Sequence, residues 1–177
     1  MVSNWVFILV GNNATGKTTF QKMVAKHLCG FEIKRLDTNL VYPVVNPSVP
    51  EKLKSIFFIS RSYQEKANVY SSIEDYFNNH FKKADICFLS SHLIEDDIRQ
   101  MINECHKLFY NVGGVFWRNS CEQNPEINRK ISMLNWDERF VIDNQYLPGK
   151  DKEEYEKIID SLTKEFVQML VNRCMGM

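Results

Sequence analysis

The chain has 177 residues and a mass of 20.8 kDa, a size that fits one domain. Its hydrophobic fraction of 44% and charged fraction of 25% are ordinary for a globular protein, which excludes a fibrous or disordered chain. Lys and Arg together number 22, as do Asp and Glu, so no overall basic field attracts the chain to nucleic acid, although a local basic cleft is still compatible with this balance.

The cysteines and the apolar segments indicate a cellular compartment. There are five cysteines, an odd number, and no two lie within four residues of each other, which excludes a CxxC metal or redox site. We therefore expect reduced, mostly buried thiols in a cytoplasmic protein. The apolar run Trp5–Val10 is too short for a signal peptide core or a membrane span, so we expect no membrane association.

The first fifty residues predict a strand, a helix and then irregular structure. The run Trp5–Val10 has the composition of a buried parallel strand. A helix is expected over Lys17–Cys29, with Gly30 just past its end. Phe31–Leu36 is interpreted as a second strand, and Thr38–Pro50, with its three prolines, as a loop.

The rest of the chain alternates between the two kinds of element. Short apolar runs predict strands at residues 56–60, 84–90, 115–117 and 139–143. Apolar residues at helical spacing predict helices at residues 66–82, 94–109 and 153–174. Gly113 and Gly114 are interpreted as the end of the middle one of these helices. Strands that alternate with helices predict an α/β fold with a mainly parallel sheet.

One motif indicates the class of ligand. The segment from Gly11 to Thr18, Gly-Asn-Asn-Ala-Thr-Gly-Lys-Thr, matches the phosphate-binding loop GxxxxGK[ST] and lies between a predicted strand and a predicted helix. Backbone N–H groups of such a loop and of the helix N-terminus bind phosphates, the lysine reaches the β- and γ-phosphates, and the hydroxyl of Thr18 is a ligand for Mg²⁺. The residues expected to bind the nucleoside triphosphate are Gly11, Asn12, Asn13, Ala14, Thr15, Gly16, Lys17, Thr18 and Thr19.

Other signatures of phosphate-loop proteins are absent. No Asp is followed by Gly three residues later, and NKxD does not occur, which argues against a GTPase of the Ras type. The predicted strand at residues 84–90 leads into Ser91 and His92 rather than into Asp-Glu, which argues against motor and transporter ATPases.

The loop and the order of elements after it resemble the small P-loop kinases, the group of nucleoside, nucleotide and polynucleotide kinases. The resemblance covers nearly the whole chain: a strand ending in Arg118, a polar segment with Arg129, a strand ending Val141-Ile-Asp-Asn144, and a C-terminal helix. It implies a single domain over residues 1–177 with the three-layer P-loop NTPase fold, helices on both faces of the sheet and a short lid at about residues 118–136. It also implies ATP and Mg²⁺ as cofactors, with Arg118 and Arg129 as catalytic lid arginines that stabilise the transferring phosphoryl group.

Three further residues are candidates for catalysis or substrate binding because of their positions in the chain. Asp37 follows the predicted second strand, and polynucleotide kinase and related hydroxyl kinases carry an Asp at the corresponding place, so the resemblance implies a general base; the alternative is a turn-forming or capping Asp. Arg61 ends the predicted third strand, at the edge where ligands bind, and is a candidate for holding an acceptor phosphate. His92 is a candidate substrate contact, or alternatively a residue at the start of a helix.

The implied activity is transfer of the γ-phosphate of ATP to a nucleoside-type acceptor, with Lys17 as a further catalytic residue. That acceptor is a free nucleoside or nucleotide, or a hydroxyl on DNA such as 5-hydroxymethyluracil, which the related phage kinases phosphorylate; a phage-encoded enzyme would act in the host cytoplasm. Residues 1–70 hold nine Lys and Arg against four Asp and Glu, which favours an anionic acceptor. The alternative is an NTP-binding switch protein without kinase activity.

Overall fold

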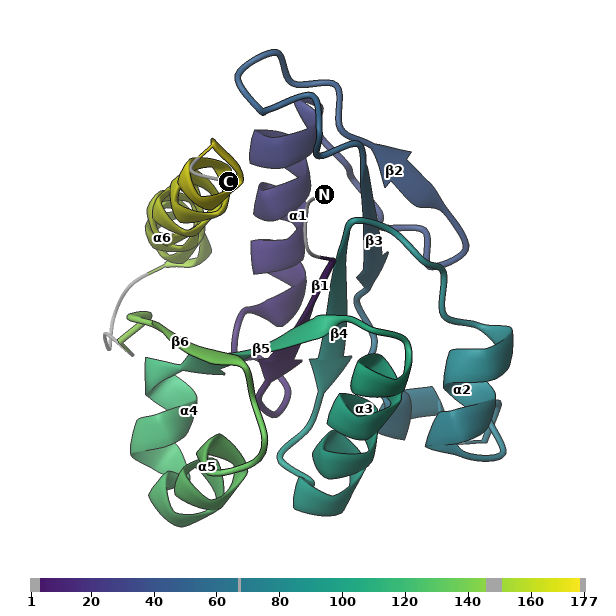
Figure 1. Ribbon diagram of the computed structural model, residues 1–177. Helices are drawn as coiled ribbons and strands as arrows, with labels where there is room; N and C mark the ends of the chain where they lie inside the picture. The colour runs from purple at the N-terminus through teal and green to yellow at the C-terminus, as the bar shows by residue number, and fades with distance from the viewer. Residues whose placement is uncertain (1–3, 67, 146–150, 176–177) are drawn as a thin grey trace.

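The computed structural model describes residues 4–66, 68–145 and 151–175, and its strands form one mixed sheet. The strands are β1 (Trp5–Val10), β2 (Val41–Pro43), β3 (Ser55–Ile59), β4 (Ile86–Ser91), β5 (Asn111–Trp117) and β6 (Glu138–Ile142). Their order across the sheet is β2-β3-β4-β1-β5-β6 (Figure 1). All neighbours are parallel except β2 and β3, so β1, β3, β4, β5 and β6 have their carboxyl ends at one edge.

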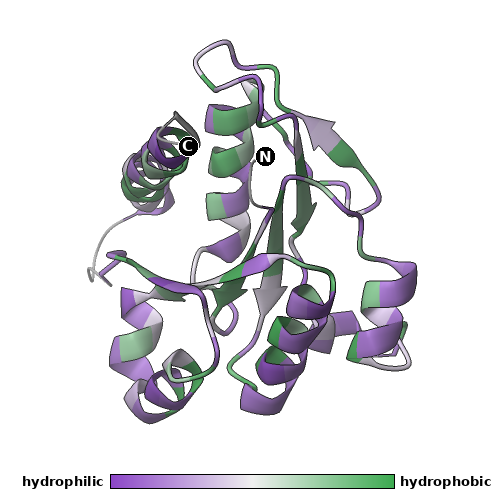
Figure 2. Cartoon of the chain, viewed as in Figure 1, coloured by the Kyte–Doolittle hydropathy of each residue, from purple (hydrophilic) through white to green (hydrophobic). Residues whose placement is uncertain are grey.

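Helices cover both faces of this sheet, which confirms the predicted three-layer α/β fold (Figure 1). The helices are α1 (Lys17–Cys29), α2 (Ile73–Asn79), α3 (Glu95–Lys107), α4 (Arg118–Gln123), α5 (Pro125–Ser132) and α6 (Lys152–Met175), with a short 3₁₀ helix, η1 (Tyr63–Lys66). One core packs α1 and α6 against the sheet, and the other packs α2, α3 and α5 against its opposite face. Figure 2 shows the hydrophobic strands of the sheet between helices whose outward surfaces are hydrophilic.

The strand β1 and the helix α1 lie where the sequence predicts them. β1 is central, with β4 on one side and β5 on the other, and Val6 to Val10 are fully buried. α1 ends at Cys29 because Gly30, with φ of 82°, adopts the left-handed conformation and donates its N–H to the carbonyl of Lys26. The strands β3, β4 and β6 and the helices α3 and α6 also agree with prediction to within a few residues.

The predicted strand Phe31–Leu36 is wrong. In the structure this segment has no strand, and Glu32, Lys34 and Arg35 are exposed. A strand inside a parallel sheet is buried on both faces, a condition that these charged side chains do not meet. The sheet edge is instead formed by β2, inside the segment that was predicted to be a loop; Pro43 is tolerated there because an edge strand has unpaired N–H positions.

Two further predictions are corrected by local interactions. The helix expected at residues 66–82 is only Ile73–Asn79, because the Ser72 side chain accepts a hydrogen bond from the N–H of Asp75 at 3.0 Å and starts the helix there. Gly113 and Gly114 lie inside β5 rather than in a turn. A Cβ at Gly113 would lie 2.7 Å from the Phe7 ring, so glycine is needed for close packing, and the turn is made by Phe109 with φ of 63°.

The segment predicted to be a lid, residues 118–136, consists largely of α4 and α5 and packs beside β5 and β6. Of the cysteines whose side chains are described, Cys29, Cys87 and Cys105 are buried, Cys121 is partly exposed, and all four are free. None of the helices in the described ranges combines the length and the apolar composition that crossing a membrane requires.

Candidate functional site

The phosphate loop connects β1 to α1 at the carboxyl edge of the sheet. Gly11 donates its N–H to the carbonyl of Ser91 at 3.0 Å, which ties the start of the loop to the end of β4. A Cβ at Gly11 would lie 2.9 Å from the Thr15 hydroxyl, and Gly16 has φ of 101°, so both positions of the motif need glycine. The loop therefore curls tightly and delivers the N-terminus of α1 to the pocket described below.

Lys17 is folded back onto this loop. Its ammonium group donates to the carbonyls of Gly11 and Asn12, the latter at 2.7 Å, and lies 3.4 Å from the Thr15 hydroxyl. Burial lowers the pKa of Lys17 from its ordinary value of 10.5 to about 8, while the charge of Glu65 acts in the opposite direction. The side chain is thus a buried cation held by carbonyl oxygens, at the place where a triphosphate would supply stronger partners.

Two residues from the C-terminal third of the chain hold the loop from outside. Asn144, which is fully buried, donates its amide N–H to the carbonyl of Thr15 at 3.0 Å and to the Tyr155 hydroxyl at 3.0 Å. The Tyr155 hydroxyl donates to the same Thr15 carbonyl at 3.3 Å. These bonds occupy the Thr15 carbonyl and hold the loop from two other parts of the chain, so its shape is set before a ligand binds.

A pocket of about 520 Å³ opens over the loop. Its second wall comes from the end of β3 and from η1, and Tyr155 completes it. The residues that line it are Asn13, Ala14, Thr15, Gly16, Lys17, Thr18, Thr19, Ser60, Arg61, Ser62, Glu65 and Tyr155. Seven of the nine predicted triphosphate-binding residues are therefore in one lining, together with the predicted acceptor contact Arg61.

Asp37 is not among the residues that line this pocket. Its carboxylate accepts the N–H of Asn39 at 2.8 Å, its N–H donates to the Tyr42 hydroxyl at 2.7 Å, and it belongs to a separate hollow formed by residues 35–39. The expected position depended on a parallel strand at residues 31–36, which does not exist, so Asp37 does not follow the carboxyl end of a parallel strand. The structure places it in the turn that was the alternative interpretation.

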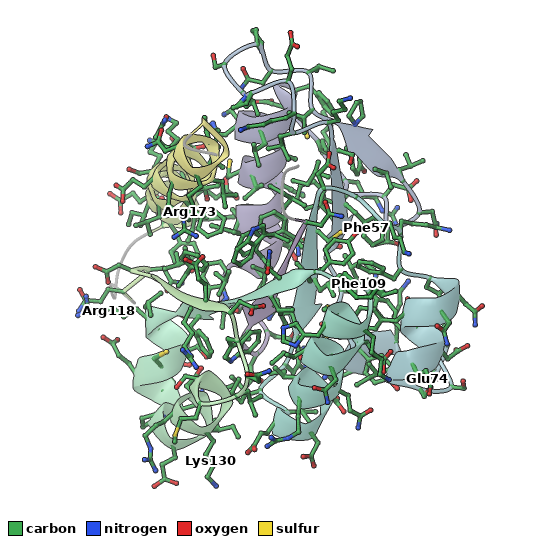
Figure 3. The ribbon with its side chains drawn as sticks, in the orientation of Figure 1. Phe57, Glu74, Phe109, Arg118, Lys130 and Arg173 are labelled. Carbon is green, nitrogen blue, oxygen red and sulfur yellow. The ribbon has the colours of Figure 1, made fainter. Side chains whose placement is uncertain are left out.

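The two predicted lid arginines also lie outside the pocket lining. Arg118, at the start of α4, projects outward (Figure 3) and donates to Asp143 at 2.7 Å and to Glu122 at 2.9 Å. These two carboxylates, Asp143 first, raise the pKa of the Arg118 guanidinium. Arg129 lies in the last turn of α5 and is exposed.

The basic residues of the first part of the chain do not gather at the pocket. Of the nine Lys and Arg among residues 1–70, Lys17 and Arg61 line it. Lys26 instead pairs with Glu32 at 3.4 Å, and Lys34 and Arg35 are exposed in the segment after α1. Most of the positive charge counted along residues 1–70 therefore lies outside the pocket lining.

The end of β4 carries no carboxylate, as the sequence predicts. Ser90 accepts a hydrogen bond from Gln21 at 3.1 Å, and Ser91 donates to the carbonyl of His92 at 3.0 Å. Asp85 lies before β4 and accepts bonds from the backbone and hydroxyl of Ser55, a structural role. Among the described residues that line the pocket, the carboxylate comes from Glu65 on η1, 3.5 Å from the ring of His92.

Mg²⁺ accompanies nucleoside triphosphates in this class of fold. The described residues offer it few oxygen ligands. Thr18 offers an exposed hydroxyl in the first turn of α1, a hard oxygen of the kind that Mg²⁺ prefers. No group of three or more His, Cys, Asp or Glu side chains is placed to hold a metal within the described ranges. This donor set suits an ion that arrives with the triphosphate and keeps most of its waters.

Five residues that line the pocket or hold the loop are not among those expected from the sequence: Ser60, Ser62, Glu65, Asn144 and Tyr155. Asn144 had a signal, because it follows the carboxyl end of a predicted parallel strand, at the edge where ligands bind. Tyr155 lies on a long helix, and Glu65 lies between the predicted strand at residues 56–60 and the predicted helix at residues 66–82; neither position carries a pattern that points to a site.

Comparisons with known proteins identify no family. No protein-family model matches the chain, and no curated protein is similar to it. Two solution NMR structures of de novo designed proteins with a P-loop NTPase fold are similar. They share 15% and 14% sequence identity with this chain and cover 93% of it in each case, over 92% and 94% of their own lengths. Their TM-scores are 0.40 and 0.37. This chain's own mainly parallel sheet, with the phosphate loop between β1 and α1, is that of a P-loop NTPase-like fold, which suggests nucleotide binding.

Proposed function

We propose that this chain is an ATP-dependent phosphotransferase that moves the γ-phosphate of ATP to a hydroxyl or phosphate of a nucleoside-type acceptor. The observation that carries the proposal is the second wall of the pocket. Arg61 and its neighbours Ser60 and Ser62 face the same space as Lys17 and Thr18. A cation in this second wall suits a second, anionic ligand beside the triphosphate, as a phosphotransferase requires.

The loop positions the donor in this proposal. Backbone N–H groups of the loop and the N-terminus of α1 bind the β- and γ-phosphates, and Lys17 moves from its carbonyl partners to these oxygens. Thr18 would hold Mg²⁺, which, when bound, neutralises part of the triphosphate charge. Asn144 and Tyr155 keep the loop in its curled form before the ligand arrives.

In this proposal the acceptor binds beside Arg61, at the pocket wall formed by the end of β3 and η1. The guanidinium binds an acceptor phosphate or supports the transferring group, and with Lys17 it supplies the positive charge of the site. Arg118 is not needed for this role, because Glu122 and Asp143 already engage it. A nucleotide and DNA both carry a phosphate that Arg61 can bind, whereas a free nucleoside offers only the hydroxyl that accepts the transferred group.

One observation favours a second candidate, an NTP-dependent switch protein. β4 ends in Ser90 and Ser91, so the strand beside the phosphate loop does not contribute the acidic residue that usually supports the Mg²⁺ shell of P-loop kinases. Such a protein would bind ATP and change its surface without transferring phosphate.

The experiment follows the label from γ-labelled ATP in the presence of Mg²⁺. One panel contains free nucleosides and nucleotides; the other contains DNA with free 5′ hydroxyls, with and without 5-hydroxymethyluracil. Label on a member of either panel supports the proposal and identifies the acceptor class, and Arg61→Ala should then raise the KM for an anionic acceptor more than the KM for ATP. ATP binding without transfer to either panel would overturn the proposal in favour of the switch protein.

A further inference from the structure

The second wall of the pocket contains a carboxylate that the surrounding structure holds in place. η1 follows β3 after Arg61 and Ser62, and the side chain of its residue Gln64 fastens it to the end of β4. Gln64 accepts the N–H of His92 at 3.1 Å and donates to the carboxylate of Asp97 at 2.6 Å. The next residue, Glu65, is therefore fixed through its backbone beside the phosphate loop.

Glu65 is the one carboxylate among the described residues that line the pocket. About a third of its side chain, 35%, is exposed, so it is accessible to a ligand while its position is constrained. Its charge acts on Lys17 across the pocket, since it opposes the burial that lowers the pKa of that lysine. Glu65 and Lys17 therefore line the same space, in which a donor and an acceptor would meet.

His92 faces Glu65 from the end of β4. Its Nε2 lies 3.5 Å from the Glu65 carboxylate, slightly beyond hydrogen-bond distance, and this nitrogen is buried without another partner in the described part of the chain. A buried ring nitrogen without a partner is costly, so a small movement of Glu65 that closes the bond is favourable. The imidazole can then hold the carboxylate in one orientation through an N–H···O bond.

Other carboxylates near this edge are already engaged. Asp97 accepts the Gln64 amide, and Asp143 pairs with Arg118. We propose, on the premise of the phosphotransferase function above, that Glu65 is the catalytic base for an acceptor hydroxyl and that His92 is its positioning residue. The acceptor implied by this assignment is an alcohol, such as a sugar or hydroxymethyl group, because a phosphate acceptor has no proton that must be removed at neutral pH.

The step balances with the groups named. The acceptor O–H bond breaks, and its proton passes to a carboxylate oxygen of Glu65. The acceptor oxygen forms a bond to the γ-phosphorus as the bond between that phosphorus and the β–γ bridging oxygen breaks, and the bonding electrons leave with ADP. His92 donates a hydrogen bond to the second carboxylate oxygen and does not change its own protonation.

The test compares Glu65→Gln with a surface control, Glu51→Gln, on the acceptor found by the labelling experiment. Glu65→Gln should lower kcat at least about 100-fold, the usual contribution of a general base, and Glu51→Gln should leave it unchanged. ATP should bind to Glu65→Gln at least as tightly as to the wild type, because a negative charge that repels the triphosphate is lost. A wild-type kcat in Glu65→Gln, or a change only in the Mg²⁺ concentration required, would overturn the assignment.

His92 is tested by replacement and rescue. His92→Ala should lower kcat about tenfold, as the loss of a hydrogen bond to a charged group does, without changing the KM for ATP. His92→Gln, which can donate a similar bond, should restore much of that loss; equal loss in both variants would overturn the positioning role. If the wild type transfers phosphate to no acceptor, the phosphotransferase function itself fails, whereas normal transfer by Glu65→Gln leaves that function intact and removes only Glu65.

Discussion

The phosphate loop lies before α1 and the segment from Phe31 to Pro50, which contains β2, lies after it, and the two are held in different ways. The loop is bonded to three separate parts of the fold: to Ser91 at the end of β4, to Asn144 after β6, and to Tyr155 on α6. The segment 31–50 has local turns at Asp37 and Asn46, and it is anchored by the pairing of β2 with β3, by the bond from the Asn46 side chain to the carbonyl of His27 and by a few buried apolar side chains. A ligand site needs the first arrangement, because pre-organised donors lose little entropy on binding.

The largest expected effect is that of Lys17→Ala, which removes the one cation of the loop. We expect a fall in kcat of at least about 100-fold, because the charge on the transferring group loses its stabilising partner. The fold should be retained, since Lys17 bonds only to its own loop. The labelled-ATP assay and a thermal melt measure the two effects. Turnover at the wild-type rate would show that catalysis takes place elsewhere.

The second effect is on the pH dependence of nucleotide binding. Burial lowers the pKa of Lys17 to about 8 in the free protein, and a bound triphosphate raises it again, so binding favours the protonated lysine. ATP affinity should therefore fall as the pH rises above about 8, by up to about tenfold per pH unit, with uptake of a proton on binding. Calorimetry in two buffers of different ionisation enthalpy measures that proton. Lys17→Met should lack the uptake, and the same uptake in this variant would assign it to another group.

The same pKa has an opposite consequence for the free protein. Between pH 8 and pH 10.5 the folded chain binds fewer protons at Lys17 than the unfolded chain, so the free energy of unfolding gains from this residue as the pH rises through that window. Lys17→Met should not show this contribution.

A smaller effect is expected from the residues that hold the loop from outside. Asn144→Ala removes a fully buried amide that donates to the Thr15 carbonyl and to Tyr155. We expect the free energy of unfolding to fall by about 1–3 kcal/mol, with weaker ATP binding because the loop is less ordered. Tyr155→Phe, which removes only a hydroxyl, should cost less in both. Denaturant titration and a fluorescent-nucleotide titration measure these changes, and unchanged ATP affinity in both variants would show that the loop holds its shape alone.

The smallest effect is expected from Asp37→Asn. Asparagine keeps the side-chain oxygen that accepts the N–H of Asn39, so the turn is retained, and kcat should not change beyond experimental error. Steady-state kinetics of Asp37→Asn and Glu65→Gln, measured side by side, compare the kcat values of the two variants. A large loss of kcat in Asp37→Asn would instead favour the base expected from the sequence, and would require the segment 31–50 to reach the pocket.

The strand β1, the phosphate loop and the end of α1 could all be predicted from the sequence. The apolar run of β1, the two glycines of the motif and the stop at Gly30 specify strand, loop and helix through short-range rules, since burial, positive φ and capping depend on a few neighbouring residues. Only the tertiary structure decided which side chains share the pocket. Asp37 lies in a turn outside the pocket lining, because the segment before it is too charged to form a strand inside a parallel sheet. Glu65 and Tyr155 reach the loop because strand order and helix packing bring distant segments together, and no local pattern encodes that proximity.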